Sequence, residues 1–485
     1  MNKDKTDLDD NKIKTKKKKI NSNAQTLKIT YFFLAVFVIM IVYFVKFLIV
    51  DGDEVINNPY NKRGQILANS VVRGNILSSD GKILAKTIVN EDGSETRSYP
   101  YGSMFAHVVG YSTYGQTGLE LQANYKLLTS NAPVIEQGLN DINGKKNIGN
   151  NVVSTLDADL TKAAYEAIGN NNAAVIAIDP STGKILTMLS QPDFDPNEIA
   201  EKYETYANDD ESSILLNRAT NGLYTPGSTF KLFTLEEYIK ENKKYKNYTY
   251  ECNGEIDIED YSMKCAGRKA HGSENLYDSF AYSCNCSFVN IGLGLDKNKL
   301  SKLCNSLMFN SELPVDFPYK KSKFVLNNKS GTFETMQTVI GQGKTLVSPL
   351  HLAMIASTIA NSGTLMKPYL IDEVQNYTGK TVKKYSPVKV KQLFSKGETE
   401  TLKEFMEGVV TYGTAKTLNN DNYKAYGKTG TAQIKDGSRD NSLFMGFAVK
   451  GDKKIAVCVV LENMPEGSTS AVPVAKAIFD EYFSE

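Results

Sequence analysis

Histidine is scarce in this chain. Only His107, His271 and His351 occur among its 485 residues, and they are far apart in the sequence. A Ser–His–Asp hydrolase needs a histidine within hydrogen-bond reach of its nucleophilic serine. Three scattered histidines give such a triad little support, so any nucleophilic serine here needs another base.

An excess of charge of either sign is also lacking. The chain has 56 Lys+Arg against 55 Asp+Glu, whereas binding to nucleic acid requires a basic surface. Two Gly-Lys-Thr stretches, at 341–345 and 427–430, lack the earlier glycine of a phosphate-binding loop, because Thr338 and Asn422 occupy its place. We therefore expect no nucleic-acid partner and no bound nucleotide.

The long hydrophobic run lies near the N-terminus. Residues 29–50 read ITYFFLAVFVIMIVYFVKFLIV, and as a helix they would span about 33 Å, enough to cross a lipid bilayer. A lysine-rich tail, residues 1–28, precedes the run, and Asp51, Asp53 and Glu54 follow it. A cleaved signal peptide or a buried helix is the alternative, but no small-residue cleavage site follows. The positive-inside rule predicts a cytoplasmic tail, a single transmembrane helix at 29–50 and an extracellular remainder anchored to the cell membrane.

The extracellular part divides by pattern into two segments. Residues 51–150 are predicted to form a small, non-catalytic α+β pedestal, with a hairpin turn at Asp80-Gly81 and a helix from Thr117. Residues 137–150 are rich in Gly, Asn and Lys and are predicted to be a linker or long loop.

Residues 151–485 show denser periodicity. Strands are predicted at 173–179 and 184–190, then a largely helical middle, then strands at 427–434, 442–449 and 454–462 and a closing helix at 471–482. Two early strands and three late ones indicate one five-stranded antiparallel sheet, assembled from both ends and flanked by helices. The predicted fold class is α+β.

A possible nucleophile lies in PGSTFK, residues 226–231. Pro and Gly bend the chain before a helix-compatible run, so Ser228 is predicted at a helix N-terminus, where backbone N–H groups are free. Lys231 follows on the same helix face, and a lysine kept neutral by burial could take the serine proton. Alone, the pair is better explained as an N-capping serine and a solvated lysine.

Two later stretches change that interpretation. Ser283, Cys284 and Asn285 lie between two helix-like runs, and residues 428–431 read KTGT at the start of a strand. S-x-x-K, S-x-N and K-T-G in this order are typical of penicillin-recognising serine enzymes. Cys284 fills the variable position of S-x-N and is predicted to be a small packed thiol.

The stretch LLNRATNGLYTPGSTFK resembles the active site of class B penicillin-binding proteins. The resemblance extends to IDPSTGKILTMLSQPDFDPN, HGSENLYDSFAYSCNCSF, IGQGKTLVSPLHLA and GKTGTAQ, and it covers essentially all of residues 150–485. RGNILSSDGKILA and Gly118-Leu119-Glu120 resemble the family's pedestal, although Ser78 and Ser79 stand where the family usually has Asp-Arg. The resemblance implies that residues 151–485 are a penicillin-binding transpeptidase domain.

The resemblance also implies an activity. A peptidoglycan D,D-transpeptidase would form an acyl-enzyme on stem peptides ending in D-Ala-D-Ala and would be inhibited covalently by β-lactams. It would need no cofactor for catalysis, and it would work with a membrane glycosyltransferase of the SEDS class. The residues implied are Ser228 as nucleophile, Lys231 as base, Ser283 as proton relay, Asn285 and Lys428 beside them, and Thr429, Gly430 and Thr431 as binders of the substrate.

The cysteines leave three alternatives open. Cys252, Cys265 and His271 precede the S-x-N stretch. They could hold a structural zinc ion with Cys286 or Asp278 as fourth ligand, the two cysteines could form a disulfide, or the thiols could be free.

Two other functions are alternatives to the transpeptidase. A β-lactamase or D,D-carboxypeptidase would use the same fold, but a pedestal and an anchor are unusual for a soluble β-lactamase. A non-enzymatic β-lactam sensor or scaffold would not need complete motifs, and residues 1–28 are too short for a signalling domain. The sequence leaves the acyl acceptor, amine or water, open.

Overall fold

The N-terminal unit contains one long helix. The computed structural model describes residues 22–47, 63–209, 211–433, 439–465, 467 and 469–484, and the chain divides into two compact units, 1–61 and 62–485. In the first unit, helix α1 (Ser22–Lys46) is long and apolar enough to cross a membrane, and none of its span is buried. The helix begins before the predicted position 29, while residues 48–50 of the predicted span lie outside the described residues.

The second unit opens with a six-stranded sheet, in the order β15-β14-β6-β2-β3-β4. It joins segments that are far apart in the sequence, because β6 pairs with β2 on one side and with β14 on the other. The predicted hairpin turn is present, with Gly81 at φ +83° between β2 and β3. The strands are β2 (Ile76–Leu77), β3 (Ile83–Val89), β4 (Glu95–Ser98), β6 (Asn151–Ser154), β14 (Ile371–Gln375) and β15 (Thr381–Lys384).

Short helices surround this sheet. They are α3 (Arg63–Ser70), η2 (Gly102–Phe105), α4 (Ala106–Val109), α5 (Gly118–Gln122), α6 (Asn124–Leu127) and α7 (Val134–Ile142). The prediction of a linker or long loop at 137–150 is wrong. Helix α7 occupies the first part of this range, and β5 (Asn147–Ile148) pairs in parallel with β1 (Val71–Val72). The single glycine of VIEQGLNDI, Gly138, does not prevent the helix, because a glycine costs only about 1 kcal/mol there.

A buried ion group joins the two pedestal motifs. Glu120 of the G-L-E stretch is fully buried. Its carboxylate accepts hydrogen bonds from Arg73 at 2.6 Å and from Arg97 at 2.7 Å. Burial alone would raise the pKa of Glu120, but the two guanidinium groups outweigh it and lower the pKa. The R-G and G-L-E motifs are therefore halves of one structural contact.

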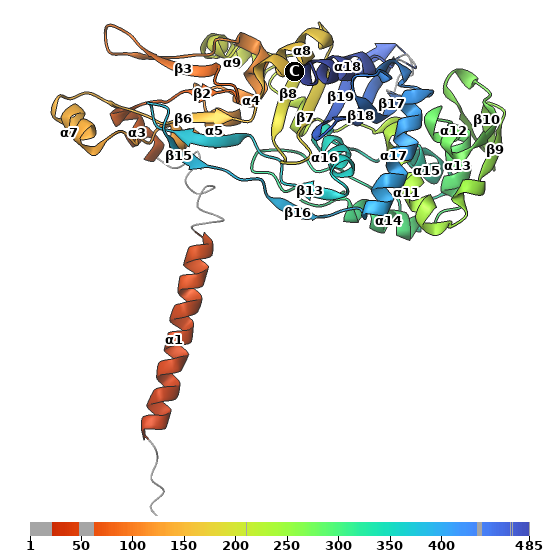
Figure 1. Cartoon of the computed structure of the whole chain (residues 1–485), viewed down its shortest axis with the longest axis horizontal. Coiled ribbons are helices and arrows are strands. Elements are labelled where there is room, and N and C mark those ends of the chain that lie inside the picture. Colours follow the sequence, from red (N-terminus) through yellow and green to blue (C-terminus); the bar gives the residue numbers. More distant parts are fainter. Residues whose placement is uncertain are drawn as a thin grey trace, which may run out of the picture. The chain divides into compact units, whose positions relative to one another are not determined.

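The predicted five-stranded antiparallel sheet is confirmed, with the order β17-β18-β19-β7-β8 (Figure 1). Its strands are β7 (Ala173–Ile178), β8 (Ile185–Gln191), β17 (Lys424–Gln433), β18 (Arg439–Lys450) and β19 (Lys453–Pro465). Helices α8 (Ala158–Ile168) and α18 (Ala471–Tyr482) cover one face, and α16 (Pro349–Ala360) packs on the other (Figure 1). Strand β17 lies at the edge of the sheet, so one side of it has no neighbouring strand.

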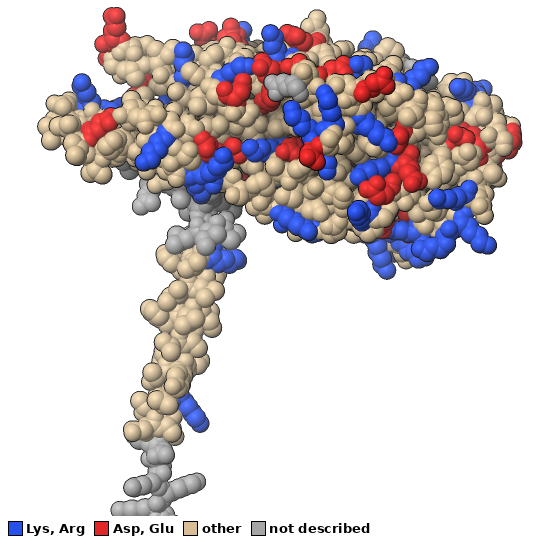
Figure 2. All heavy atoms as spheres, viewed as in Figure 1, with Lys and Arg blue, Asp and Glu red and all other residues tan. Residues whose placement is uncertain are grey.

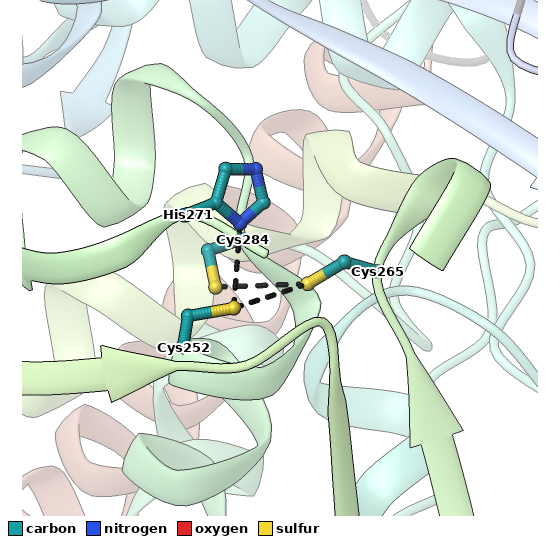
Figure 3. Close-up of side chains that lie close together, drawn as sticks. All are labelled: Cys252, Cys265, His271 and Cys284. Atoms are coloured by element: carbon teal, nitrogen blue, oxygen red, sulfur yellow. Dashed lines mark hydrogen bonds between the residues drawn. The ribbon is translucent and has the colours of Figure 1, made fainter. Parts of the chain in front are cut away.

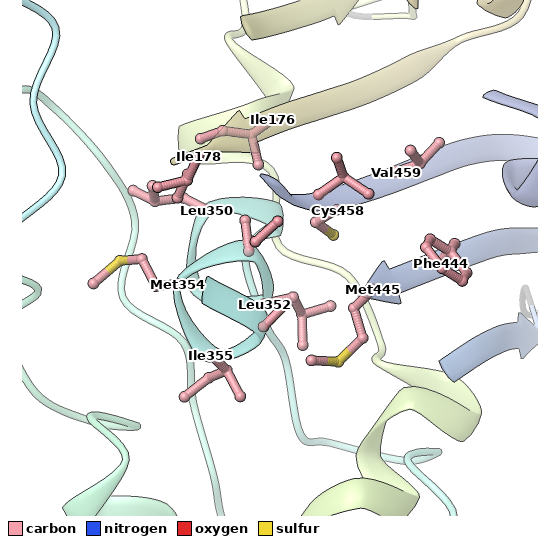
Figure 4. Close-up of a cluster of buried hydrophobic side chains, with 14 of the residues drawn as sticks. Ile176, Ile178, Leu350, Leu352, Met354, Ile355, Phe444, Met445, Cys458 and Val459 are labelled. Atoms are coloured by element: carbon pink, nitrogen blue, oxygen red, sulfur yellow. The ribbon is translucent and has the colours of Figure 1, made fainter. Parts of the chain in front are cut away.

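The core lies between α16 and this sheet. Every residue of α16 is buried, and Leu350, Leu352 and Ile355 lie with Cys458 of β19 and Met445 of β18 in Figure 4. A helix that is apolar all round is stable only when it is surrounded, and here it forms the centre of the domain.

The middle of the chain is largely helical, as predicted, with small β-hairpins. Its helices are η3 (Pro196–Glu198), α9 (Ile199–Ala207), α10 (Arg218–Asn221), η4 (Gly227–Phe230), α11 (Lys231–Glu241), η5 (Tyr245–Asn247), η6 (Ala266–Arg268), α12 (Leu276–Ala281), α13 (Asn285–Leu293), α14 (Lys297–Ser306), α15 (Thr332–Val339), α17 (Lys396–Thr411) and η7 (Lys416–Leu418). The remaining strands are β9 (Thr249–Cys252), β10 (Glu255–Ile258), β11 (Tyr261–Lys264), β12 (Gly272–Asn275), β13 (Thr364–Met366) and β16 (Lys389–Gln392).

Candidate active site

Ser228 lies in the 3₁₀ turn η4, directly before α11. Pro226 precedes the turn and Gly227 begins it with φ +54°, so the chain bends there as the sequence predicts. Ser228 is partly exposed, whereas Lys231, the first residue of α11, is fully buried. The backbone N–H of Lys231 donates to the Ser228 carbonyl, so serine and lysine share one turn.

The ammonium group of Lys231 is held by the S-x-N loop. Its Nζ donates to the Asn285 Oδ1 at 2.7 Å and to the Ser283 carbonyl at 2.6 Å, and it lies 3.3 Å from the Ser283 Oγ. The Asn285 Nδ2 donates to the Lys264 carbonyl at 2.8 Å, which fixes the orientation of the amide. Burial lowers the pKa of Lys231 to about 8, because an ammonium ion loses its hydration there.

Ser283 adopts an uncommon backbone conformation. Its φ is +61°, in the left-handed region that residues with a Cβ rarely enter. The cap of the following helix, α13, is Cys284, whose Sγ accepts from the Ser287 N–H at 3.4 Å. The Ser283 hydroxyl is thereby directed toward the lysines.

Lys428 approaches the same hydroxyl from strand β17. Its Nζ donates to the Ser283 Oγ at 2.8 Å and to the Thr429 carbonyl at 3.1 Å. Lys428 is fully buried, and burial together with repulsion from Lys231 holds its pKa well below the usual value for lysine. One hydroxyl therefore lies between two buried amines, an arrangement that can pass a proton between them.

A loop that sequence reasoning did not assign connects the first and third motifs. The Gly227 N–H donates to the Gly341 carbonyl at 2.8 Å, and the Gln342 Nε2 donates to the Thr431 carbonyl at 3.2 Å. A Cβ on Gly341 would lie 1.8 Å from the Gly227 oxygen, so only glycine allows this approach. In the sequence, the resemblance of IGQGKT to the family was the signal that could have identified this loop. In the structure, the loop supports the turn that holds Ser228.

Gly430 allows β17 to pack against the serine turn. A Cβ there would lie 2.8 Å from the Thr229 Cγ2 and 3.0 Å from the Pro226 carbonyl oxygen. The sequence assigned this glycine to the approach of a substrate, and the structure shows a close internal contact. Thr414, absent from the predicted site, shares a 2.6 Å hydrogen bond with the Thr429 hydroxyl.

None of the histidines hydrogen-bonds a motif serine. His107 contacts the Pro192 carbonyl and His351 the Leu307 carbonyl, and burial lowers the pKa of each to about 4. His271 lies instead beside Cys252, with 3.4 Å between Nδ1 and Sγ.

Three cysteines and His271 converge beside the S-x-N loop (Figure 3). Their ligand atoms lie within 4.8 Å of one another, and the fourth member is Cys284, whereas the sequence suggested Cys286 or Asp278. The Cys265 Sγ is 3.7 Å from the sulfurs of Cys252 and Cys284, and all six cysteines of the chain are free thiols in the structure.

The wider comparison with known proteins agrees with this geometry. Residues 173–480 match the family described as penicillin binding protein transpeptidase domain. The chain belongs to this family. Residues 73–152 match a second description, penicillin binding protein A dimerisation domain. The matched range of the first family includes the S-x-x-K, S-x-N and K-T-G motifs.

Curated relatives of this penicillin-binding protein family cover most of the chain. Stage V sporulation protein D of Bacillus subtilis is 30% identical over 80% of this chain, which spans 64% of that protein's length. Peptidoglycan D,D-transpeptidase PbpA of Mycolicibacterium smegmatis is 28% identical, with 88% of this chain and 92% of that protein covered.

Solved structures match over a similar range. The D,D-transpeptidase domain of a peptidoglycan glycosyltransferase from Eggerthella lenta has a TM-score of 0.76 at 29% identity, with 85% of this chain and 98% of that chain covered. The penicillin G acyl-enzyme complex of penicillin-binding protein A from Mycobacterium tuberculosis has a TM-score of 0.76 at 26% identity, with 85% of this chain and 99% of that chain covered.

Proposed function

We propose that the chain is a membrane-anchored peptidoglycan D,D-transpeptidase that β-lactams acylate on Ser228. The observation that carries this proposal is the Ser283 hydroxyl, placed between the buried amines of Lys231 and Lys428 next to the turn that holds Ser228. Family membership and the relatives named as D,D-transpeptidases support the same reaction.

The first half of the reaction is acylation. The Ser228 Oγ attacks the carbonyl carbon of the penultimate D-Ala, and neutral Lys231 takes the hydroxyl proton. The C–N bond then breaks, an ester to Ser228 forms, and the terminal D-Ala leaves as an amine. Ser283 supplies the proton to that amine and regains one from the lysine pair.

The substrate lies along the open edge of β17 in this proposal. An extended peptide can add to an edge strand through backbone hydrogen bonds. The N–H groups of Ser228 and Thr431 would stabilise the oxyanion, at about 3 kcal/mol for each donor. Lys428, Thr429 and Thr431 would bind the terminal carboxylate of the stem peptide.

The second half transfers the acyl group. An amine of a neighbouring stem peptide attacks the Ser228 ester and forms the cross-link. We place the catalytic unit outside the cell with the N-terminus in the cytoplasm, because lysines precede α1 and acids follow it. A glycan-polymerising membrane enzyme of the SEDS class is the proposed partner, because the resemblance to class B penicillin-binding proteins implies one.

Fluorescent penicillin tests the proposal directly. We expect a long-lived covalent adduct on the full-length protein and none on Ser228→Ala. Ser181→Ala, at an exposed serine in the turn between β7 and β8, should label normally. Rapid loss of the adduct would indicate a β-lactamase, and absence of any adduct would indicate a scaffold. Product analysis with lipid-linked peptidoglycan precursor then separates cross-linking from release of D-Ala by water.

We further propose a structural zinc ion bound by Cys252, Cys265, His271 and Cys284. Tetrahedral zinc with bonds of about 2.3 Å to sulfur places sulfurs about 3.8 Å apart. The Cys265 Sγ lies 3.7 Å from the sulfurs of Cys252 and Cys284, and the Cys286 sulfur lies 3.4 Å from it. A disulfide would need about 2.05 Å. The residues therefore fit zinc, and because Cys284 separates Ser283 from Asn285, such an ion would fix the S-x-N loop.

Metal analysis under reducing conditions tests the zinc site. We expect stoichiometric zinc in the wild-type protein, loss of zinc in Cys265→Ser, and full retention in Cys304→Ser, whose buried thiol on α14 lies outside the cluster. If the wild-type protein folds and labels with penicillin but contains no metal, the zinc proposal is refuted and the cysteines are packed thiols.

A further inference from the structure

Helix α7 presents an aliphatic side to solvent. Val134, Ile135, Leu139 and Ile142 are 84%, 80%, 54% and 82% exposed, and α7 contributes no buried residue to the core. These positions fall on one side of a helix with 3.6 residues per turn. A soluble domain normally buries such a stripe, so a contiguous exposed one marks an interaction surface.

A lysine-rich segment follows the turn that contacts α7. Residues 380–391, which include β15 and most of β16, carry five exposed lysines and three exposed valines, namely Lys380, Lys383, Lys384, Lys389, Lys391, Val382, Val388 and Val390. Within the described part of the chain, only Lys384 of these five has an acidic partner, Glu373 at 4.0 Å. Figure 2 shows Lys and Arg side chains along the lower edge of this view, over β15 and β16.

Hydrogen bonds join the helix to the turn that leads into β15. The Tyr377 hydroxyl lies 2.8 Å and 2.7 Å from the two carboxylate oxygens of Glu136 on α7. The apolar stripe of α7 therefore lies next to the start of the lysine-rich segment 380–391, whose far end pairs with β13 and reaches α14, where the Lys391 Nζ donates to the Ser306 carbonyl at 3.3 Å.

The chain enters the ectodomain next to this surface. Strand β5 follows α7 and pairs with β1, which directly follows α3. The Lys146 Nζ also donates to the Ala68 carbonyl of α3 at 2.8 Å. Residues 47–62 join α3 to the helix α1, and fully extended they reach at most about 55 Å. This end of the ectodomain is thus tethered within reach of any bilayer that α1 crosses.

We propose that α7 and residues 380–391 form a second membrane-contact surface for anionic lipid. The aliphatic side chains of α7 enter the interfacial layer, and the lysines bind lipid phosphates. The composition favours lipid over protein, because aliphatic residues and lysine dominate and the arginine, tryptophan and tyrosine anchors typical of protein interfaces are missing among the exposed residues named. The inference rests on the membrane anchor and not on the acyl-transfer reaction.

Such a contact has a consequence for catalysis. A single membrane-spanning helix does not by itself specify the orientation of the ectodomain above the bilayer. A second contact at the sheet that carries β15 fixes one end of the ectodomain at the membrane surface. The opposite, transpeptidase end would then be held at a defined orientation toward the peptidoglycan.

The absence of tryptophan from the natural chain provides the probe. Ile142→Trp places one tryptophan in the stripe, and Val89→Trp is the matched control on β3, toward the opposite end of the sheet from β15. Each full-length variant is reconstituted into phosphatidylcholine vesicles with or without phosphatidylglycerol, and brominated acyl chains serve as quenchers. Penicillin labelling of each variant shows that the fold and the active site are intact.

We expect a blue-shifted emission at position 142 and bromolipid quenching at least about twofold stronger than at position 89, in anionic vesicles. Glutamine at the five lysine positions, or removal of phosphatidylglycerol, should reduce the difference. A tryptophan at 142 that stays accessible to iodide in anionic vesicles overturns the proposal, as does shielding that requires an added membrane protein. A failure of penicillin labelling with quenching intact would refute only the proposed function.

Discussion

The rate of β-lactam acylation should rise with pH as Lys231 loses its proton. Burial lowers the pKa of this lysine to about 8, and only the neutral amine can accept the Ser228 proton. The neutral fraction is about one tenth near pH 7 and about nine tenths near pH 9. Acylation should therefore become about tenfold faster across this interval, with a midpoint near pH 8.

Two variants identify the titrating group. Burial and repulsion from Lys231 hold the pKa of Lys428 well below the usual value for lysine, so the two lysines must be distinguished by substitution. Lys428→Gln should slow acylation by removing the donor to Ser283, but the midpoint should stay near that of the wild type. Lys424→Gln, on the same strand but half exposed and paired with Glu407, should change neither the rate nor the midpoint.

The assay is the second-order rate constant for labelling of the full-length protein with fluorescent penicillin at a series of pH values. Melting temperature at each pH shows whether the protein stays folded. A flat or falling profile would refute the role of Lys231 as the base. Loss of the pH dependence in Lys428→Gln would instead assign the titration to Lys428.

Three further substitutions test the structure. Gly430→Ala should slow acylation at least about tenfold, because the added Cβ would push β17 away from the serine turn. Gly397→Ala, where the added Cβ meets open space, should not change the rate. Equal acylation rates in the two variants would refute the role of the Gly430 contact. Asn285→Ala should slow acylation about tenfold or more by removing the 2.7 Å acceptor of Lys231, and a wild-type rate would show that this hydrogen bond is dispensable. Glu120→Gln should lower the free energy of unfolding by about 3 kcal/mol, because two buried arginines lose their counter-charge. Urea denaturation measures this change, and Glu91→Gln, at an exposed position, is the control.

Local sequence patterns were sufficient for the parts of the fold with strong periodicity. The five strands of the catalytic sheet, the closing helix and the bend before Ser228 follow from residues near one another in the chain. The pattern failed at residues 137–150, where composition suggested a linker and the structure has α7 and β5. Glycine and asparagine counts concealed the helical spacing of aliphatic residues just before them.

The order of three short motifs determined from sequence alone which residues to examine, because S-x-x-K, S-x-N and K-T-G specify residue types that acyl transfer requires. Only the tertiary structure decided how they meet: Ser283 takes a left-handed backbone conformation and lies between Lys231 and Lys428, which are 197 positions apart in the printed sequence. Tertiary structure also decided that Cys284 joins the cysteine cluster and that Gly341 braces the serine turn. Contacts between distant segments depend on packing geometry, and a linear pattern of residues carries no information about that geometry.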